Sequence, residues 1–200
     1  MCIRDRPRLW ATRKVAYLLN QIRLHGKNKE LETEVVRLGK RFGIVTPYTS
    51  FLVVEDSGRP VLARRLREAR RNFARAESGR GAVQAARDLA AFKKAGAPAA
   101  APAQPQMLGI DADAKEELER AVASRVVHIA DKTFYRRPDG FLYDSLYDEA
   151  KDRDKIIEIK AFSDEYFALV REHPRLGRYL AEGKPMVIVL GGKVYKIVTG

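Results

Sequence analysis

The chain has 200 residues, of which 46% are apolar and 32% charged, and it contains a single cysteine. This composition is typical of a folded globular protein of one domain or two small ones, and it excludes wholesale disorder. One cysteine excludes an internal disulfide and a metal site built from several thiolates. The longest apolar runs, such as Met186–Leu190, span about five residues, against roughly 20 for a membrane-spanning helix. We therefore expect neither a transmembrane segment nor a signal peptide in this chain.

Positive charge is concentrated in the first half of the sequence. Residues 1–95 hold 22 Lys and Arg against 9 Asp and Glu, whereas residues 96–200 hold 16 against 17, and the whole chain carries +12. Such an asymmetry is found in nucleic-acid-binding proteins, and it also arises when a long helix carries arginines on its exposed face. We favour the exposed helix as the explanation.

A pair of helices is predicted between about residues 8 and 42, because apolar residues recur there every three or four positions. The two apolar stripes are Ala11, Val15, Leu18 and Ile22, then Leu31, Val35, Leu38 and Phe42. We expect Gly26 to end the first helix, Asn28 to cap the second, and Gly43 to follow its last turn.

The next block, residues 44–55, is rich in Val, Ile, Thr, Tyr and Phe, a composition that predicts an extended strand. Pro47 would restrict this strand to a sheet edge, a bulge or a break between two short strands. Since Phe51–Val54 is continuously apolar, both faces are expected to be covered. No partner strand is evident nearby, so the segment is expected to complete a sheet that another domain supplies.

A long basic helical region follows, starting at Pro60, a residue favoured at helix N-termini. Its apolar stripe is Leu62, Leu66, Ala69 and Phe73, and its arginines are Arg64, Arg65, Arg67, Arg70, Arg71 and Arg75. A helical pattern resumes over Ala82–Ala95, and the Ala/Pro-rich stretch at 96–106 is predicted to be an extended linker.

The C-terminal block is predicted to be a small α+β unit that starts at about residue 110. Its expected strands are Val126–Ile129, Thr133–Tyr135, Phe141–Tyr143, Ile156–Lys160, Met186–Leu190 and Val194–Val198. Ser163 is expected to cap one helix, Pro174 to open a second short helix, and Gly191 and Gly192 to form the last hairpin turn. The whole chain is therefore expected to be α+β, with N-terminal helices, an extended strand segment, a long basic helical region and this C-terminal domain.

Residues that could carry chemistry are present, but their spacing does not favour a site. The candidates are His25, His128 and His173; Asp144, Asp148, Asp152 and Asp154; Ser50 and Ser145; and Tyr135, Arg136, Arg137 and Tyr143. The histidines lie far apart, the acidic run misses the EF-hand pattern, and neither serine has an adjacent histidine. We interpret the acidic run as a solvated connection, and the aromatic and basic residues as sheet surface rather than a clamp for a nucleic-acid strand. We expect no catalytic, cofactor-binding or metal site and no enzymatic activity.

The stretch Leu9–Asp56 resembles a segment of a known family. It is similar to the region just after the von Willebrand factor A domain in proteins that combine this domain with a VIT domain, namely the inter-alpha-trypsin inhibitor heavy chains and their bacterial relatives. The most specific part is GIVTPYTS at residues 43–50, together with an upstream Leu-Trp-Ala helix start. The motif residues, to which we assign structural roles, are Leu9, Trp10, Thr46, Pro47, Thr49 and Ser50. With SGRGAVQAARDLAAFKKA and several C-terminal stretches, which resemble the bacterial members, the similarity covers about Arg8–Val198.

The resemblance implies an exported, non-enzymatic adhesion or interaction protein, located in the periplasm, on the cell surface or outside the cell, that binds protein partners through its VIT and A domains. The Asp-x-Ser-x-Ser run of the A-domain metal site does not occur in this sequence, and neither does the Asp-Pro-His sequence of animal heavy chains. No functional residue is therefore carried over, and the chain is expected to be the C-terminal portion of such a protein. The alternative is a basic nucleic-acid-binding protein that uses the Arg64–Arg75 helix.

These observations predict five segments along the chain. They are an artefactual leader at 1–7, a helix–helix–strand segment at 8–58, a basic helical region at 59–95, an Ala/Pro linker at 96–107 and a small α+β domain at 108–200. The leader is set apart because it matches nothing in the resemblance.

Overall fold

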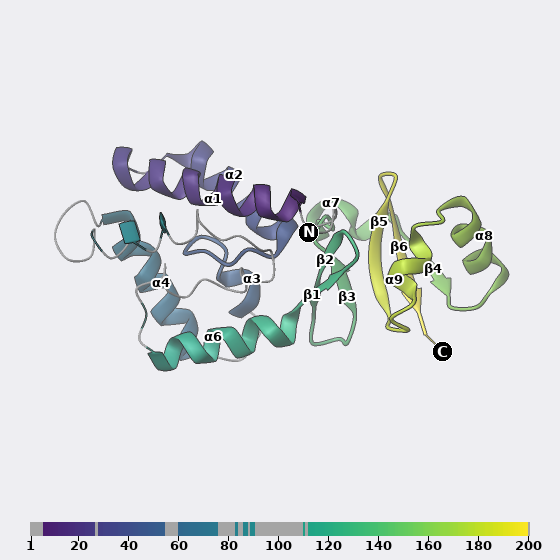
Figure 1. Cartoon of the computed structure of the whole chain (residues 1–200). Coiled ribbons are helices and arrows are strands. Elements are labelled where there is room, and N and C mark those ends of the chain that lie inside the picture. Colours follow the sequence, from purple (N-terminus) through teal and green to yellow (C-terminus); the bar gives the residue numbers. More distant parts are fainter. Residues whose placement is uncertain are drawn as a thin grey trace. The chain divides into compact units, whose positions relative to one another are not determined.

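The computed structural model describes residues 6–26, 28–54, 60–75, 83, 86–87, 89–90, 110 and 112–199. The chain divides into two compact units, residues 1–124 and 125–200 (Figure 1). Helices make up the described part of the first unit, and a six-stranded mixed sheet is the centre of the second. The predicted α+β class is confirmed. The predicted linker at 96–107 lies outside the described residues, as does most of the helical pattern at 82–95.

The helical unit is built around the two predicted amphipathic helices. Its elements are α1 Arg6–His25, α2 Lys29–Phe42, α3 Phe51–Val54, α4 Pro60–Arg75 and α6 Ala112–Arg125, which reaches the boundary between the units. The four apolar residues predicted to line one face of α1 are all buried, as are Val35 and Leu38 of α2, and Tyr48, Phe73 and Leu89 complete the same core. The four apolar stripe residues of α4 are buried as well. Helix α1 begins at Arg6, so the last two residues of the predicted leader are helical.

Both predicted ends of α2 are confirmed. The Asn28 side chain accepts hydrogen bonds from the backbone N–H groups of Glu30 and Leu31 at 2.9 and 3.2 Å. Gly43 adopts a left-handed φ of 64° and donates its N–H to the Gly39 carbonyl, as the residue after a helix commonly does. These local signals fix where the next segment leaves the helix.

The strand predicted at residues 44–55 is wrong. In the described part of this segment, residues 47–50 form a turn and Phe51–Val54 forms one turn of helix, α3. Val53 and Val54 are buried against the helical unit. The apolar run thus covers a local core with one side of a short helix, and the expectation that it completes a sheet of another domain is wrong as well.

Local hydrogen bonds explain why this segment turns instead of extending. The N–H groups of Thr49 and Ser50 both donate to the Thr46 carbonyl, at 3.1 and 3.0 Å. Pro47 has no N–H to donate, and its fixed φ favours the second position of a turn. Because the backbone groups find partners within the segment, the β-branched residues here do not need a neighbouring strand.

The sheet unit contains all six predicted strands, each within two residues of its expected ends. They are β1 Val126–Ile129, β2 Lys132–Arg136, β3 Leu142–Asp144, β4 Ile156–Lys160, β5 Met186–Leu190 and β6 Lys193–Val198. The strand order is β1-β2-β3-β5-β6-β4. The β3–β5 and β4–β6 pairs are parallel and the others antiparallel, and the β3–β5 register has only two residue pairs.

Helices and loops complete the sheet unit. They are α7 Glu149–Asp152, a short 3-10 turn at Arg153–Lys155, α8 Asp164–Glu172 and α9 Leu176–Leu180. Leu169 of α8 and Tyr179 of α9 belong to the larger core, with Phe134 and Met186 of the sheet, and a smaller cluster forms around Tyr147. The Ser163 cap is confirmed, and so is the hairpin turn, in which both glycines have positive φ as a type I′ turn requires.

Helix α6 was not predicted from the sequence. Its buried residues are Ala114, Leu118, Ala121 and Val122, which recur at helical spacing. The small size of the two alanines weakens this apolar pattern, although the spacing itself is sufficient to indicate a helix.

Candidate functional site

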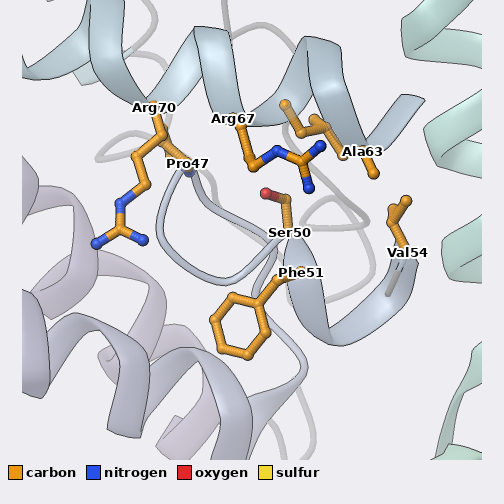
Figure 2. A pocket seen from close by; sticks show the side chains of 8 residues that line it. Pro47, Ser50, Phe51, Val54, Ala63, Arg67 and Arg70 are labelled. Atoms are coloured by element: carbon orange, nitrogen blue, oxygen red, sulfur yellow. The ribbon is translucent and has the colours of Figure 1, made fainter. Parts of the chain in front are cut away.

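A small pocket lies in the helical unit between the turn at residues 47–50, α3 and α4 (Figure 2). Its lining residues are Pro47, Ser50, Phe51, Val54, Ala63, Leu66, Arg67 and Arg70. The pocket volume is about 70 Å³, well below the roughly 300–1,000 Å³ of sites for drug-sized ligands. Its size suits a group no larger than a single amino-acid side chain.

Two buried threonines hold the turn that forms the rim of the pocket. The Thr49 hydroxyl accepts a hydrogen bond from the Thr46 N–H at 2.8 Å and donates to the Ile44 carbonyl at 2.8 Å. The Thr46 hydroxyl lies 3.0 Å from that of Thr49 and accepts from the Tyr48 N–H at 3.2 Å. Buried backbone groups that the helices do not reach are satisfied in this way, so the rim has a defined shape.

Close packing with α2 further restricts the rim. A Cβ atom at Gly39 would lie 2.5 Å from Thr49 Cγ2 and 2.9 Å from the Ile44 carbonyl oxygen. Only glycine allows this approach of the helix to the turn. The pocket rim is thus fixed by side-chain hydrogen bonds on one side and by backbone contact on the other.

The two arginines that line the pocket differ in their surroundings. Arg70 donates to Glu32 at 3.2 Å, and its guanidinium carbon lies 4.9 Å from the centre of the Tyr48 ring. Arg67 makes no hydrogen bond or ion pair with any residue that the structure describes. In Figure 2 the Ser50 hydroxyl points toward α4 and Arg67. Arg67 is therefore the cation that an acidic group entering the pocket would meet.

Tyr48 connects the rim to the core of the helical unit. Its ring is 1% exposed and packs edge-on against Phe73, with 6.3 Å between ring centres. Its hydroxyl has no hydrogen-bond partner among the described residues, and burial raises the pKa of Tyr48 to about 12. The side chain remains neutral at ordinary pH and acts in packing.

The structure places the predicted motif residues in distinct environments. Thr46 and Thr49 are buried and hold the turn, whereas Pro47 and Ser50 line the pocket. At the start of α1, Leu9 is 7% exposed and Trp10 is 54% exposed. The motif therefore contributes both to the scaffold and to the pocket.

Sequence reasoning did not place the other pocket residues together. They are Phe51, Val54, Ala63, Leu66, Arg67 and Arg70. The first two were assigned to a strand, and Arg67 was one of six arginines on a helix with nothing in the sequence to distinguish it. The four-residue spacing of Ala63 and Arg67 on α4 was the available signal, because it places both on one side of the helix.

The prediction of a solvated connection is wrong for one residue of the acidic run, Asp144, whereas Asp154 is exposed. The Asp144 side chain is fully buried and pairs with Lys132 Nζ at 2.5 Å. It also accepts hydrogen bonds from the N–H groups of Leu146 and Val189 at 3.0 and 3.1 Å. Asp148 caps α7 through the Ala150 N–H. No cluster of three or more potential ligands for a metal occurs within the described ranges.

Two of the aromatic and basic residues named from the sequence, Arg137 and Tyr143, contact each other. The Arg137 guanidinium lies 4.1 Å from the centre of the Tyr143 ring and donates to Glu149 at 2.9 Å. The Tyr143 hydroxyl donates to Asp139 at 2.7 Å, and burial raises the pKa of Tyr143 to about 12. The Arg137 guanidinium and the Tyr143 hydroxyl are thus each paired with a carboxylate.

The histidines lie at separate places in the fold. His25 ends α1, His128 lies on β1 with its ring 3.2 Å from the Thr133 hydroxyl, and His173 follows α8.

A scan against protein-family models and searches of the curated proteins and the solved structures find no match to this chain. Among the described helices, none has the length and apolar character needed to cross a membrane.

Proposed function

We propose that this chain is a non-enzymatic protein-interaction module, the C-terminal portion of an exported adhesion protein of the VIT and von Willebrand factor A type. One observation carries the proposal. The most specific part of the resemblance, residues 43–50, supplies Pro47 and Ser50 to a pocket that is also lined by Arg67, a residue with no ion-pair partner among the described residues.

The chemistry of the pocket fits a protein partner. Phe51, Val54 and Leu66 supply an apolar lining, and Arg67 with the Ser50 hydroxyl supplies polar groups at one side. Interfaces between proteins combine an apolar contact with a few hydrogen-bonding groups in this manner. We propose that the pocket receives an apolar side chain that is followed or preceded by an acidic residue.

The family assignment is tested by the reading frame upstream of the codon for Pro7 in the source genome. We expect the frame to continue into an A domain that carries an Asp-x-Ser-x-Ser run. A start codon at Met1 behind a ribosome-binding site would refute the assignment.

The interaction is tested with the VIT and A-domain region encoded upstream, produced as a separate protein. We expect it to bind this chain in calorimetry, and we expect Arg67→Glu to weaken binding at least tenfold. Arg64→Glu is the matched control, because Arg64 is exposed on the same helix but does not line the pocket. Equal loss in both variants, or no binding by the native chain, would contradict the proposal.

A second candidate, nucleic-acid binding through α4, is favoured by a different observation. Arg64, Arg67 and Arg71 are exposed at helical spacing and have no partner among the described residues. Three phosphate contacts predict that log K falls with log salt with a slope of about −2 to −3. Fluorescence anisotropy with a labelled oligonucleotide tests this, and micromolar binding at physiological salt would give this candidate precedence over the first.

A further inference from the structure

One side of α1 carries three large apolar side chains that no described part of the chain covers. Trp10, Tyr17 and Leu24 are 54%, 49% and 56% exposed. They are spaced seven residues apart, which is close to two helical turns, so they follow one line about 21 Å long. We refer to these three residues as the α1 stripe.

The helix cannot rotate to bury the α1 stripe. Its opposite face packs into the core through Ala11, Val15 and Leu19, all of which are 0% exposed. Single exposed apolar residues are common on protein surfaces. Three of them in a straight line at heptad spacing supply one of the two apolar positions per heptad by which a helix meets a second helix.

The charged residues that α1 itself contributes are all basic. Helix α1 contains no Asp or Glu, and Lys14 Nζ lies 5.5 Å from the centre of the Tyr17 ring. The acidic group near Lys14 is Glu34 on α2. The hydrogen bonds that Glu34 accepts from Arg37 are the main cause that lowers the Glu34 pKa, and the positive charge of Lys14 lowers this pKa further. Both carboxylate oxygens of Glu34 accept from Arg37 at 2.7 Å, so the hydrogen bonds of this carboxylate go to Arg37 and not to Lys14.

We propose that the α1 stripe docks an amphipathic helix of a partner protein, one with apolar residues at heptad spacing and acidic residues beside them. Charge complementarity selects this partner, because acidic side chains would face Arg13 and Lys14. A second copy of α1 would bring like charges together. A lipid surface would need a broader apolar face than a single line of residues. The proposal goes beyond the pocket and does not depend on it.

The experiment uses Trp10, which is the sole tryptophan of the chain, as a fluorescence reporter. The full chain is titrated with a synthetic helical peptide that has Leu at the a and d positions and Glu at e and g. A peptide with Lys in place of Glu is the matched control. We expect only the Glu peptide to shift the Trp10 emission to shorter wavelength, saturably, and we expect added salt to weaken the effect.

Variants test whether the α1 stripe is the binding surface. Leu24→Glu keeps the reporter and is expected to weaken binding of the Glu peptide at least tenfold. Val61→Glu is the control, because Val61 on α4 is 54% exposed and the charge change is the same. Circular dichroism of both variants checks that the fold is retained.

Several results would overturn the proposal. One is an unchanged Trp10 emission with the Glu peptide up to about 1 mM, which corresponds to negligible affinity. Another is equal weakening by Leu24→Glu and Val61→Glu. A shift caused by anionic phosphatidylglycerol vesicles but not by the Glu peptide would assign the stripe to a membrane, and a shift that follows protein concentration alone would assign it to a second copy.

Discussion

Each unit of the molecule contains a buried polar side chain that satisfies backbone groups beyond the reach of regular secondary structure. In the helical unit it is Thr49, which bonds the Thr46 N–H and the Ile44 carbonyl. In the sheet unit it is Asp144, which bonds two backbone N–H groups and the Lys132 ammonium. We call Thr49 the neutral anchor and Asp144 the charged anchor. Both satisfy backbone groups, but they do so with different chemical groups.

The difference follows from what each group can donate and accept. A hydroxyl both donates and accepts, so Thr49 serves an N–H and a carbonyl without any counter-charge. A carboxylate only accepts and must be paired when buried, and Lys132, which also donates to the Val189 carbonyl at 3.0 Å, supplies the positive charge. The neutral anchor therefore acts within five residues of chain, whereas the charged anchor joins β2, β3 and β5.

Removal of the charged anchor should have the largest effect. Asp144→Ala leaves Lys132 without its counter-ion and the partly buried N–H groups of Leu146 and Val189 without partners. We expect a loss of about 3–5 kcal/mol in the free energy of unfolding, measured by urea denaturation. Glu158→Ala is the control, because it removes an exposed pair with Lys196 on the same sheet and should cost less than about 1 kcal/mol. Similar losses in the two variants would show that Asp144 does not act as a buried anchor.

Removal of the neutral anchor should cost somewhat less. Thr49→Val keeps the shape of the side chain but leaves the Thr46 N–H and the Ile44 carbonyl unsatisfied, so we expect a loss of about 2–4 kcal/mol in thermal or urea unfolding. Thr33→Val removes a hydroxyl that donates to the Lys29 carbonyl on the exposed side of α2, and it should change stability by less than about 0.5 kcal/mol. A Thr49→Val protein as stable as the native chain would contradict this account of the turn.

The contact beneath the neutral anchor can be tested with a pair of glycines. Gly39→Ala forces a Cβ against Thr49 and the Ile44 carbonyl, and we expect a loss of about 1–3 kcal/mol despite the better helix propensity of alanine. At Gly177 in α9 a Cβ would meet nothing within 4 Å, so Gly177→Ala should gain about 0.5 kcal/mol. Changes of the same sign in the melting temperatures of the two variants would contradict the tight approach of α2 to the turn.

The smallest effects are expected at two tyrosine hydroxyls. Tyr48→Phe removes a buried hydroxyl with no described partner and should gain up to about 1 kcal/mol. Tyr179 donates to Asp131 at 2.6 Å, a bond that lowers the pKa of Asp131, so Tyr179→Phe should lose about 1 kcal/mol. We therefore expect the free energy of unfolding to rise in Tyr48→Phe and to fall in Tyr179→Phe, relative to the native chain. Changes of the same sign in the two variants would contradict this expectation.

The Tyr48 variant also has a predicted pH dependence. Burial raises the pKa of Tyr48 to about 12 in the folded chain, whereas an unfolded tyrosine titrates near 10. Because the pKa is higher in the folded than in the unfolded chain, the folded state keeps its full stability below about pH 10. It then loses stability as the pH rises from about 10 toward 12, since the unfolded chain releases the tyrosine proton more readily. Tyr48→Phe lacks this loss, so its advantage over the native chain should grow across that range in denaturant titrations.

The sequence is informative where structure depends on neighbours in the chain. The Asn28 cap, the Gly43 end of α2 and the two-glycine turn of the last hairpin are all recognisable, because each depends on residues within one turn. The strand prediction at residues 44–55 failed since propensity does not reveal that Thr46 and Thr49 bond to the nearby backbone.

Two further failures come from contacts between distant residues. Asp144 looks like a solvated aspartate until Lys132 and Val189 are brought to it, the latter from 45 positions along the chain. Likewise, Arg67 differs from Arg64 only because α4 packs across the turn that carries Pro47 and Ser50. Neither contact can be recognised from the residues next to Asp144 or Arg67 in the sequence.

The two-pair register between β3 and β5 has a consequence for how the sheet unit forms and opens. It joins one three-stranded ribbon, β1-β2-β3, to another, β5-β6-β4, by the shortest pairing in the sheet. Contacts between residues so far apart in sequence close only after the intervening chain is ordered. We expect the pairing of β3 with β5 to be the last part of the sheet to form during folding. Amide hydrogens of β3 and the start of β5 should then exchange with solvent earlier than those of the β5–β6 hairpin, through an opening in which each ribbon keeps its own hydrogen bonds.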